Sequence, residues 1–172
     1  GQAPLSFAKT GGGTQVLSGP CTYSGATTID GGILTVTGSL EGNTPITVAA
    51  PGTLELGDGS VTDDCWISFR PTTNGITNAI TGDGTAILND AIAIDLGAAD
   101  PTDGNFWLLI DVDNVAVTYD ENFEVTGFTE TGAGVWTGMT PGNIWTFTEL
   151  TGEVGTVVSN LATWAEANAP TE

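Results

Sequence analysis

Short runs of β-branched and aliphatic residues alternate along this chain with clusters of Gly, Asn, Asp, Ser and Pro, and this alternation predicts many short β-strands. Three segments share one form, a glycine followed by a short apolar strand: 13–17, 32–36 and 52–56. Their glycines recur at a step of about 20 residues, which is typical of stacked coils that are each too small to bury an apolar face alone. A fourth copy at 84–88 follows after a longer gap, so we expect the register to be interrupted before it.

The stretch from Lys9 to Leu40 carries a denser set of matching letters. They are Lys9-Thr10-Gly11, Gly13-Thr14, Leu17-Ser18-Gly19, Thr22-Tyr23-Ser24-Gly25, Thr27-Thr28-Ile29, Gly31-Gly32 and Leu34-Thr35-Val36. With these letters the stretch resembles the autotransporter-associated β-strand repeat, a module of secreted and surface-displayed bacterial proteins. The resemblance implies a right-handed parallel β-solenoid that serves as an extracellular scaffold and carries no chemistry of its own.

The pattern divides the chain into three parts within what we expect to be one compact all-β domain. Residues 1–98 predict the solenoid-like repeat region. Residues 99–158 predict an antiparallel meander with aromatic anchors that closes off the stack as a cap. Residues 159–172 form a tail with one short helix that Ser159 or Asn160 would cap. The pattern leaves one alternative fold open, a β-sandwich whose turns are evenly spaced.

The charge of the chain is strongly one-sided and excludes two classes of partner. There are 21 acidic residues against the two basic residues Lys9 and Arg70, which gives a net charge of −19. Binding to nucleic acid needs a basic surface, and an anionic membrane surface would repel this chain. No apolar run is long enough to span a bilayer, so we expect no membrane insertion. If copies assemble, salt or divalent cations should favour that assembly.

Residue types that support most enzyme chemistry are missing from the sequence. The chain contains no histidine, which removes serine–histidine and cysteine–histidine catalysis and histidine zinc sites. No phosphate-binding or dinucleotide-binding motif is present. We therefore expect no enzyme, although paired carboxylates on a parallel β-helix leave a polysaccharide-active enzyme as a minor alternative.

Calcium is the best cofactor candidate, because several turns are rich in carboxylates. The candidate ligands are Asp58, Asp63, Asp64, Asp100, Asp103, Asp111 and Asp113, with Asn105 and Asn114 beside them. None of these turns fits the EF-hand pattern, and simple solvated acidic turns are the competing interpretation. The five tryptophans, Trp66, Trp107, Trp136, Trp145 and Trp164, are interpreted as core residues, with a sugar-stacking surface as the alternative.

The two cysteines, Cys21 and Cys65, and the residue Gly1 at the first position predict a secreted, mature chain whose signal peptide has been removed. The cysteines form an intrachain disulfide in the simplest interpretation. If they lie two coils apart, however, about 9–10 Å separates their strands, which is too far for a bridge. A disulfide between two subunits is then the alternative.

A secreted structural subunit is the function that these patterns favour. Head-to-tail stacking of copies would bury the unpaired strand edges at both ends of a solenoid and would give an extracellular filament, surface layer or matrix. The candidate interface residues are Pro4, Leu5, Phe7, Leu161 and Trp164. The alternative function is an adhesin or a carbohydrate-binding module with polysaccharide as its partner.

Overall fold

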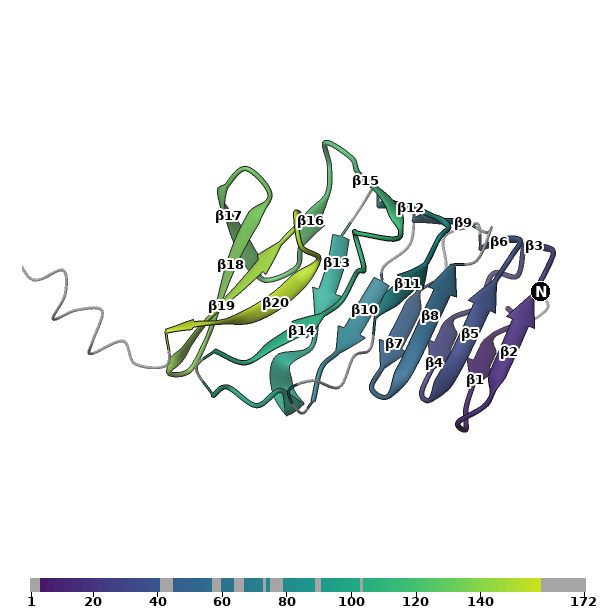
Figure 1. The fold of residues 1–172 in the computed structure, drawn as a ribbon, viewed down its shortest axis with the longest axis horizontal. Coiled ribbons are helices and arrows are strands. Elements are labelled where there is room, and N and C mark those ends of the chain that lie inside the picture. Colours follow the sequence, from purple (N-terminus) through teal and green to yellow (C-terminus); the bar gives the residue numbers. More distant parts are fainter. Residues whose placement is uncertain are drawn as a thin grey trace, which may run out of the picture.

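The structure is a computed structural model that describes residues 4–40, 45–56, 60–63, 67–72, 74, 79–88, 91–102 and 104–158 of the chain, including their side chains except those at 56, 62, 63, 157 and 158. The described part is all-β: twenty strands, β1 to β20, and one turn of 3-10 helix, η1 (Leu96–Ala98), form four sheets. Figure 1 shows three parallel sheets that share one stack and a fourth, antiparallel sheet at the far end from β1.

The strands of the three parallel sheets come from positions that alternate along the chain. Sheet A contains β1 (Phe7–Lys9), β4 (Thr27–Ile29), β7 (Ile46–Ala49), β10 (Ile67–Arg70), β13 (Ala91–Ile94) and β16 (Glu124–Val125). Sheet B contains β2 (Thr14–Leu17), β5 (Gly32–Val36), β8 (Gly52–Leu56) and β11 (Ile80–Gly82). Sheet C contains β3 (Pro20–Cys21), β6 (Ser39–Leu40), β9 (Ser60–Asp63), β12 (Thr85–Leu88) and β15 (Ala116–Tyr119).

Consecutive strands therefore belong to different sheets, and each coil returns to pair with the coil before it. The coil β4–β5–β6 pairs with β1–β2–β3 on one side and with β7–β8–β9 on the other, always in parallel. This topology is a parallel β-solenoid, as the sequence predicted. The β-sandwich alternative is wrong, because sheets A, B and C pair their strands in parallel, whereas a sandwich is built from antiparallel sheets.

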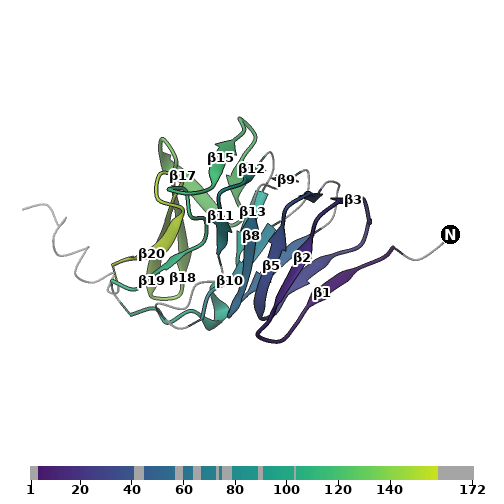
Figure 2. The ribbon, with the colours of Figure 1, turned by 45° about the vertical axis from the view of Figure 1, so that its right-hand side comes forward.

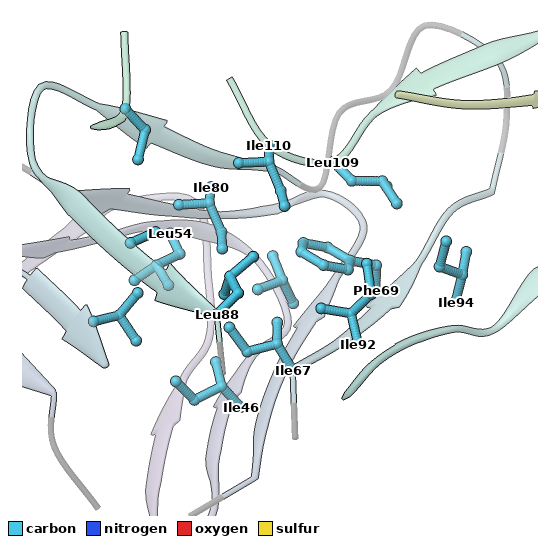
Figure 3. Close-up of a cluster of buried hydrophobic side chains, with 14 of the residues drawn as sticks. Ile46, Leu54, Ile67, Phe69, Ile80, Leu88, Ile92, Ile94, Leu109 and Ile110 are labelled. Carbon is cyan, nitrogen blue, oxygen red and sulfur yellow. The ribbon is translucent and has the colours of Figure 1, made fainter. Parts of the chain in front are cut away.

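Alternation along each short strand places one row of side chains inside the stack and one row outside. In the inner rows, the register of the strands places apolar side chains of successive coils on top of one another. Figure 3 shows a cluster of these buried side chains. One row of sheet A holds Ile46, Ile67 and Ile92, and a second holds Ile29, Val48, Phe69 and Ile94. Leu34, Leu54 and Ile80 form the matching row of sheet B. All of these side chains are buried, so each coil completes its core only through its neighbours.

The glycine pattern predicted two of these registers, and the interruption expected before the fourth copy is present. Gly32 of β5 lies directly opposite Gly52 of β8, and Thr14, which follows Gly13, lies opposite Ile33. Gly84, however, precedes a strand of sheet C, because β12 pairs with β9. The strand that continues sheet B after β8 is β11, where Ile80 lies opposite Leu54. The fourth copy of the pattern is thus a strand of another sheet.

The antiparallel part is interleaved with the solenoid, where the sequence predicted a continuous meander from residue 99. Sheet D has the order β14 (Phe106–Leu108), β20 (Glu153–Val158), β19 (Asn143–Thr148), β18 (Val135–Thr140) and β17 (Phe128–Gly132). Between β14 and β17 the chain returns to the stack: β15 adds to sheet C and β16 adds to sheet A, both in parallel. The parallel sheets thus continue to Val125, past the boundary at residue 98 that the sequence pattern predicted.

Sheet D covers the end of the stack that is farthest from β1 (Figures 1 and 2). Its large side chains are buried and belong to the same apolar cluster as the core of the solenoid: Trp107, Trp136, Trp145, Phe147 and Val154. The core interpretation of these three tryptophans is therefore confirmed. Trp66 and Trp164 lie outside the described residues, as does the tail for which the sequence predicted a short helix.

Candidate functional site

The two ends of the stack differ, and the end formed by β1, β2 and β3 is open in the described part of the chain (Figure 1). Each of these strands is the outermost of its sheet. On the inner side of β2, Ile33 donates its N–H to the carbonyl of Gly13 at 3.1 Å, and Thr37 donates to Leu17 at 3.0 Å. Because parallel pairing uses alternate residues, the backbone groups of Thr14 and Val16 face away from the stack.

Apolar side chains remain incompletely covered at this open end. Leu5 is 72% exposed and Val16 is 49% exposed, and Phe7 and Leu17 are half-buried. Two open hollows of about 370 and 550 Å³ lie here, one along β1 and β2 and the other between Leu5 and the segment 20–24. Of the predicted interface residues, Pro4, Leu5 and Phe7 therefore lie at the open end, whereas Leu161 and Trp164 lie outside the described residues.

Lys9 fills the last position of an inner row at the open end. It lies in register with the buried residues Ile29 and Val48, and although it is a cation it is itself only 7% exposed. The Nζ atom donates hydrogen bonds to the carbonyl oxygens of Thr10 (3.0 Å), Gly11 (2.8 Å) and Gly31 (2.9 Å). Three acceptors match the three N–H groups of an ammonium ion, which is how a cation can be buried without a carboxylate beside it.

Thr27 is a second polar residue in the inner rows close to the open end. It lies between Phe7 and Ile46 in sheet A and is buried. Its hydroxyl group shares a 2.5 Å hydrogen bond with the hydroxyl of Tyr23, so its polar atom has a partner. Gln15, in register with Leu34, turns its amide to donate to the carbonyl of Val16 at 3.0 Å. The first coil is thus more polar than the coils it covers.

Charge is segregated along the stack axis. The first 29 residues contain no acidic residue and one cation, Lys9, whereas all 21 acidic residues follow. At the covered end, four acidic side chains around β16 and β17 are exposed: Asp120, Glu121, Glu124 and Glu130. Arg70, which is exposed, lies with its Nε atom 3.7 Å from a carboxylate oxygen of Asp95. The first coil is therefore free of carboxylates, although the exposed Asp30 lies next to it in the second coil, and the covered end is acidic.

An aromatic cluster joins sheet D to the stack. The ring of Phe123 lies 4.7 Å from that of Tyr119, 5.7 Å from that of Trp136 and 6.5 Å from that of Phe147, measured between ring centres. Phe123 comes from the turn between β15 and β16, whereas Trp136 and Phe147 belong to sheet D. The contacts with Tyr119 and Trp136 are edge-on, and such contacts add to the free energy of burial. The cluster fixes the cap on the last coils.

Glu149 makes the polar contact at the same junction. Its carboxylate accepts a 2.7 Å hydrogen bond from the indole Nε1 of Trp136, and its backbone carbonyl accepts from the hydroxyl of Tyr119 at 3.3 Å. Burial raises the pKa of Tyr119, and the negative charge of Glu149 raises it further. Sequence reasoning missed both Phe123 and Glu149, because nothing local in the sequence shows that residues 119–123 return to the stack.

A groove runs between η1 and the tip of the β18–β19 hairpin. It has a volume of about 640 Å³, and its apolar lining includes Leu96, Phe128 and Met139. Met139 is 77% exposed at its rim. Trp145 also borders the groove, but it is buried and donates its Nε1 hydrogen to Thr140 Oγ1 at 2.8 Å. The polar residues of the lining are Asp95, Thr126, Thr140 and Asn143.

The calcium prediction stays a prediction for this chain. Among the described side chains, no three acidic or cysteine residues gather in a group able to hold a metal ion. Asp111 accepts from Asn114 Nδ2 at 2.9 Å, and Asp100 accepts from the hydroxyl and the N–H of Thr102 at 2.7 and 3.1 Å. These bonds hold the pKa of Asp100 below its ordinary value, and the bond from the Thr102 hydroxyl has the largest effect. Asp113 is exposed; Asp58, Asp64, Asp103 and the side chain of Asp63 lie outside the described residues.

The disulfide prediction is equally untested, since Cys65 lies outside the described residues. Cys21 is half-buried at the open end, forms no disulfide within the described part, and lies in register with Leu40 and, one strand further, Val61. Strands β3 and β9 are therefore separated by β6. Two strands separated by a third lie about 9–10 Å apart, which is too far for a disulfide between them. The disulfide between subunits therefore stays open as an alternative.

The open end is also the part of the chain that is similar to a known family. Residues 7–36 match the passenger-associated-transport-repeat. The repeat begins at β1 and ends with β5, so it spans the first coil and the start of the second. No curated protein and no solved structure matches the chain.

The repeat and the β-solenoid together fit a secreted, passenger-like protein related to autotransporters, and they favour a structural role over catalysis. Within the described residues, the structure contains no helix that is long and apolar enough to cross a membrane. The resemblance that the sequence carried at Lys9 to Leu40 is thus confirmed by the repeat, and Lys9 and Gly32, which meet at the open end, both lie inside it.

Proposed function

We propose that the protein is a secreted structural subunit that assembles head-to-tail into an extracellular filament, surface layer or matrix. One observation carries this proposal: the passenger-associated-transport-repeat forms the open end of a parallel β-solenoid whose other end is covered by sheet D. A solenoid end with unpaired strand edges gains free energy when another chain pairs with it. Because the two ends differ, a contact between them repeats without closing and gives a linear polymer.

The charge of the subunit sets the conditions for assembly. With a net charge of −19, copies repel one another at low ionic strength, and salt shortens the range of that repulsion to about 10 Å at 0.1 M. Assembly should therefore appear on adding sodium chloride. If calcium bridges carboxylates of neighbouring subunits, millimolar calcium should promote assembly at a sodium chloride concentration that is ineffective alone.

Electron microscopy and light scattering of the purified chain test this proposal. The protein is compared in low salt, in 0.5 M sodium chloride and with added calcium, each with and without a reductant. Regular filaments or sheets with one subunit spacing support the proposal, and their loss in reductant would assign Cys21 and Cys65 to a disulfide between subunits. A protein that stays monomeric under all of these conditions would refute the proposal.

A carbohydrate-binding module is the second candidate, and the groove between η1 and the β18–β19 hairpin favours it. Phe128 and Met139 offer an apolar wall, and Thr140 and Asn143 offer hydroxyl and amide groups, the combination that binds a sugar ring. Since Trp145 borders the groove, binding of a neutral oligosaccharide should change the tryptophan fluorescence. Unchanged fluorescence and no heat of binding across a panel of neutral glycans would remove this candidate.

A further inference from the structure

We infer that strand β2 at the open end of one copy pairs with strand β17 at the edge of sheet D in a second copy. This inference rests on the proposed function and assigns its contact surface. At the open end, β2 has four residues, whereas β1 has three and β3 has two. It therefore offers the longest unpaired strand edge among the three outermost strands of the solenoid.

At the covered end, β17 is the corresponding edge. It is the last strand in the order of sheet D, it has five residues, and all of them except Phe128 are exposed. The other edge of sheet D, β14, faces the solenoid: Phe106 donates its N–H to Asn74 Oδ1 at 3.3 Å, and Ile110 just beyond it forms a bridge with Ile80. Strand β16, at the end of sheet A, has two residues. The longest edge left for a partner is β17.

The distribution of charge selects a second copy as the partner. The strands β1, β2 and β3 contain no carboxylate, and their one cation, Lys9, is buried. The side chains of Asp120, Glu121, Glu124 and Glu130, around β16 and β17, are acidic and exposed. Contact between the two unlike ends therefore brings strands without exposed charge against an anionic region, with no repulsion between like charges. Contact between two covered ends would bring like charges together.

Pairing along β17 does not require burial of a free carboxylate. Glu130 is the one acidic residue of the strand, and its Oε1 atom accepts a 3.1 Å hydrogen bond from the N–H of Gly134. Its carboxylate is thus held at the β17–β18 turn. The neighbouring side chains, Thr129 and Thr131, are neutral residues with high strand propensity, which suits an added strand.

Three lysine substitutions test the pairing, since lysine is a common device by which natural edge strands avoid association. Val16→Lys changes the exposed outer face of β2, and Thr129→Lys changes β17. Thr85→Lys is the matched control, because Thr85 is exposed on β12, which has a partner strand on each side. Each variant becomes less negative by one charge, so weaker assembly cannot arise from greater repulsion between subunits.

Sedimentation velocity at a salt concentration where the wild-type chain assembles gives the readout, with circular dichroism and thermal unfolding to confirm that each variant is folded. We expect Val16→Lys and Thr129→Lys each to weaken association at least tenfold and Thr85→Lys to assemble like the wild type. A mixture of Val16→Lys and Thr129→Lys keeps one intact pair of edges. That mixture should form a heterodimer with one copy of each.

The outcomes separate this inference from the proposed function. If the wild-type chain stays monomeric, the proposed function itself fails. If the wild-type chain assembles and Val16→Lys assembles equally well, the open end is not the contact and the inference is overturned. If Val16→Lys is monomeric but Thr129→Lys assembles like the wild type, two open ends meet each other, and β17 is excluded. The absence of a heterodimer in the mixture would also overturn the pairing of β2 with β17.

Discussion

Gly32 lies against the buried ammonium group of Lys9, so closely that a Cβ atom at residue 32 would be 2.6 Å from the Nζ atom. The carbonyl oxygens of Gly13 and Gly11 would lie within 2.5 Å of the same Cβ atom. Gly32 also has a φ angle of 68°, in the left-handed region that favours glycine. The lysine and the glycine therefore depend on each other at the open end of the stack.

Replacing Gly32 with alanine should destabilise the fold by about 2–4 kcal/mol, because the new methyl group meets backbone oxygens that cannot move easily and the residue must keep a positive φ angle. Chemical denaturation followed by circular dichroism measures this loss. Gly12→Ala is the matched control, since no atom lies within 4 Å of a Cβ atom built at residue 12. It should change the free energy of unfolding by less than about 0.5 kcal/mol, and equal effects of the two changes would contradict the argument.

Truncation of the Phe123 side chain should cause one of the largest losses in the free energy of unfolding. It is buried, and its ring contacts the rings of Tyr119, Trp136 and Phe147. Phe123→Ala removes the contact between the last coils and sheet D and leaves a cavity, so we expect a loss of about 3–5 kcal/mol. Phe106→Ala, at a side chain that is 54% exposed, should cost less than about 1 kcal/mol. Thermal unfolding of both variants tests the difference, and a smaller loss for Phe123→Ala than for Phe106→Ala would show that the aromatic cluster does not hold the cap.

Removal of the Glu149 carboxylate should loosen the cap more than the stack. Glu149→Ala leaves the buried indole N–H of Trp136 without its acceptor, which costs about 1–3 kcal/mol. Glu149→Gln keeps an acceptor oxygen and should recover part of that loss. Hydrogen exchange followed by mass spectrometry should show faster exchange in β18, β19 and β20, with β4 to β8 unchanged. Uniformly faster exchange in all sheets would indicate that the solenoid and sheet D unfold as one unit.

Alkaline pH should destabilise the protein through Tyr119. Its pKa is raised in the folded chain by burial and by the charge of Glu149, so the fold favours the neutral phenol. The stability linked to this group is fully present below its unfolded pKa of about 10 and is lost as the pH rises above that value. The free energy of unfolding of the wild type should therefore fall more steeply from pH 9.5 to 11.5 than that of Tyr119→Phe. Equal slopes for the two proteins would contradict the predicted titration.

The repetitive part of the fold was readable in the sequence because its signals are local. The step of about 20 residues between glycines predicted stacked coils, and the structure has Gly32 opposite Gly52. The copy at Gly84 belongs to another sheet for a physical reason: the same short form, a glycine before a strand, suits any sheet of a solenoid. Only pairing in space distinguishes β11, which continues sheet B, from β12, which continues sheet C.

The junction between solenoid and cap was not readable, because it depends on contacts between distant segments. The apolar run at 106–110 looks like any buried strand, yet β14 pairs with β20 at the end of the described chain, and β15 and β16 return to the stack. The role of Lys9 was missed for a related reason. In the sequence, a lysine beside glycines is typical of a solvated turn. Its three carbonyl partners, one of them Gly31 in the next coil, are evident only in the structure.

The burial of Lys9 should protect the protein from cleavage by extracellular proteases. Proteases of trypsin specificity must draw a lysine or arginine side chain into a deep pocket before they cut, and this chain contains only two such residues. The side chain of Lys9 is held inside the stack by three carbonyls, and Arg70 is followed by Pro71, a bond that such proteases cut poorly. While it stays folded, the protein should therefore remain intact where less protected proteins are digested.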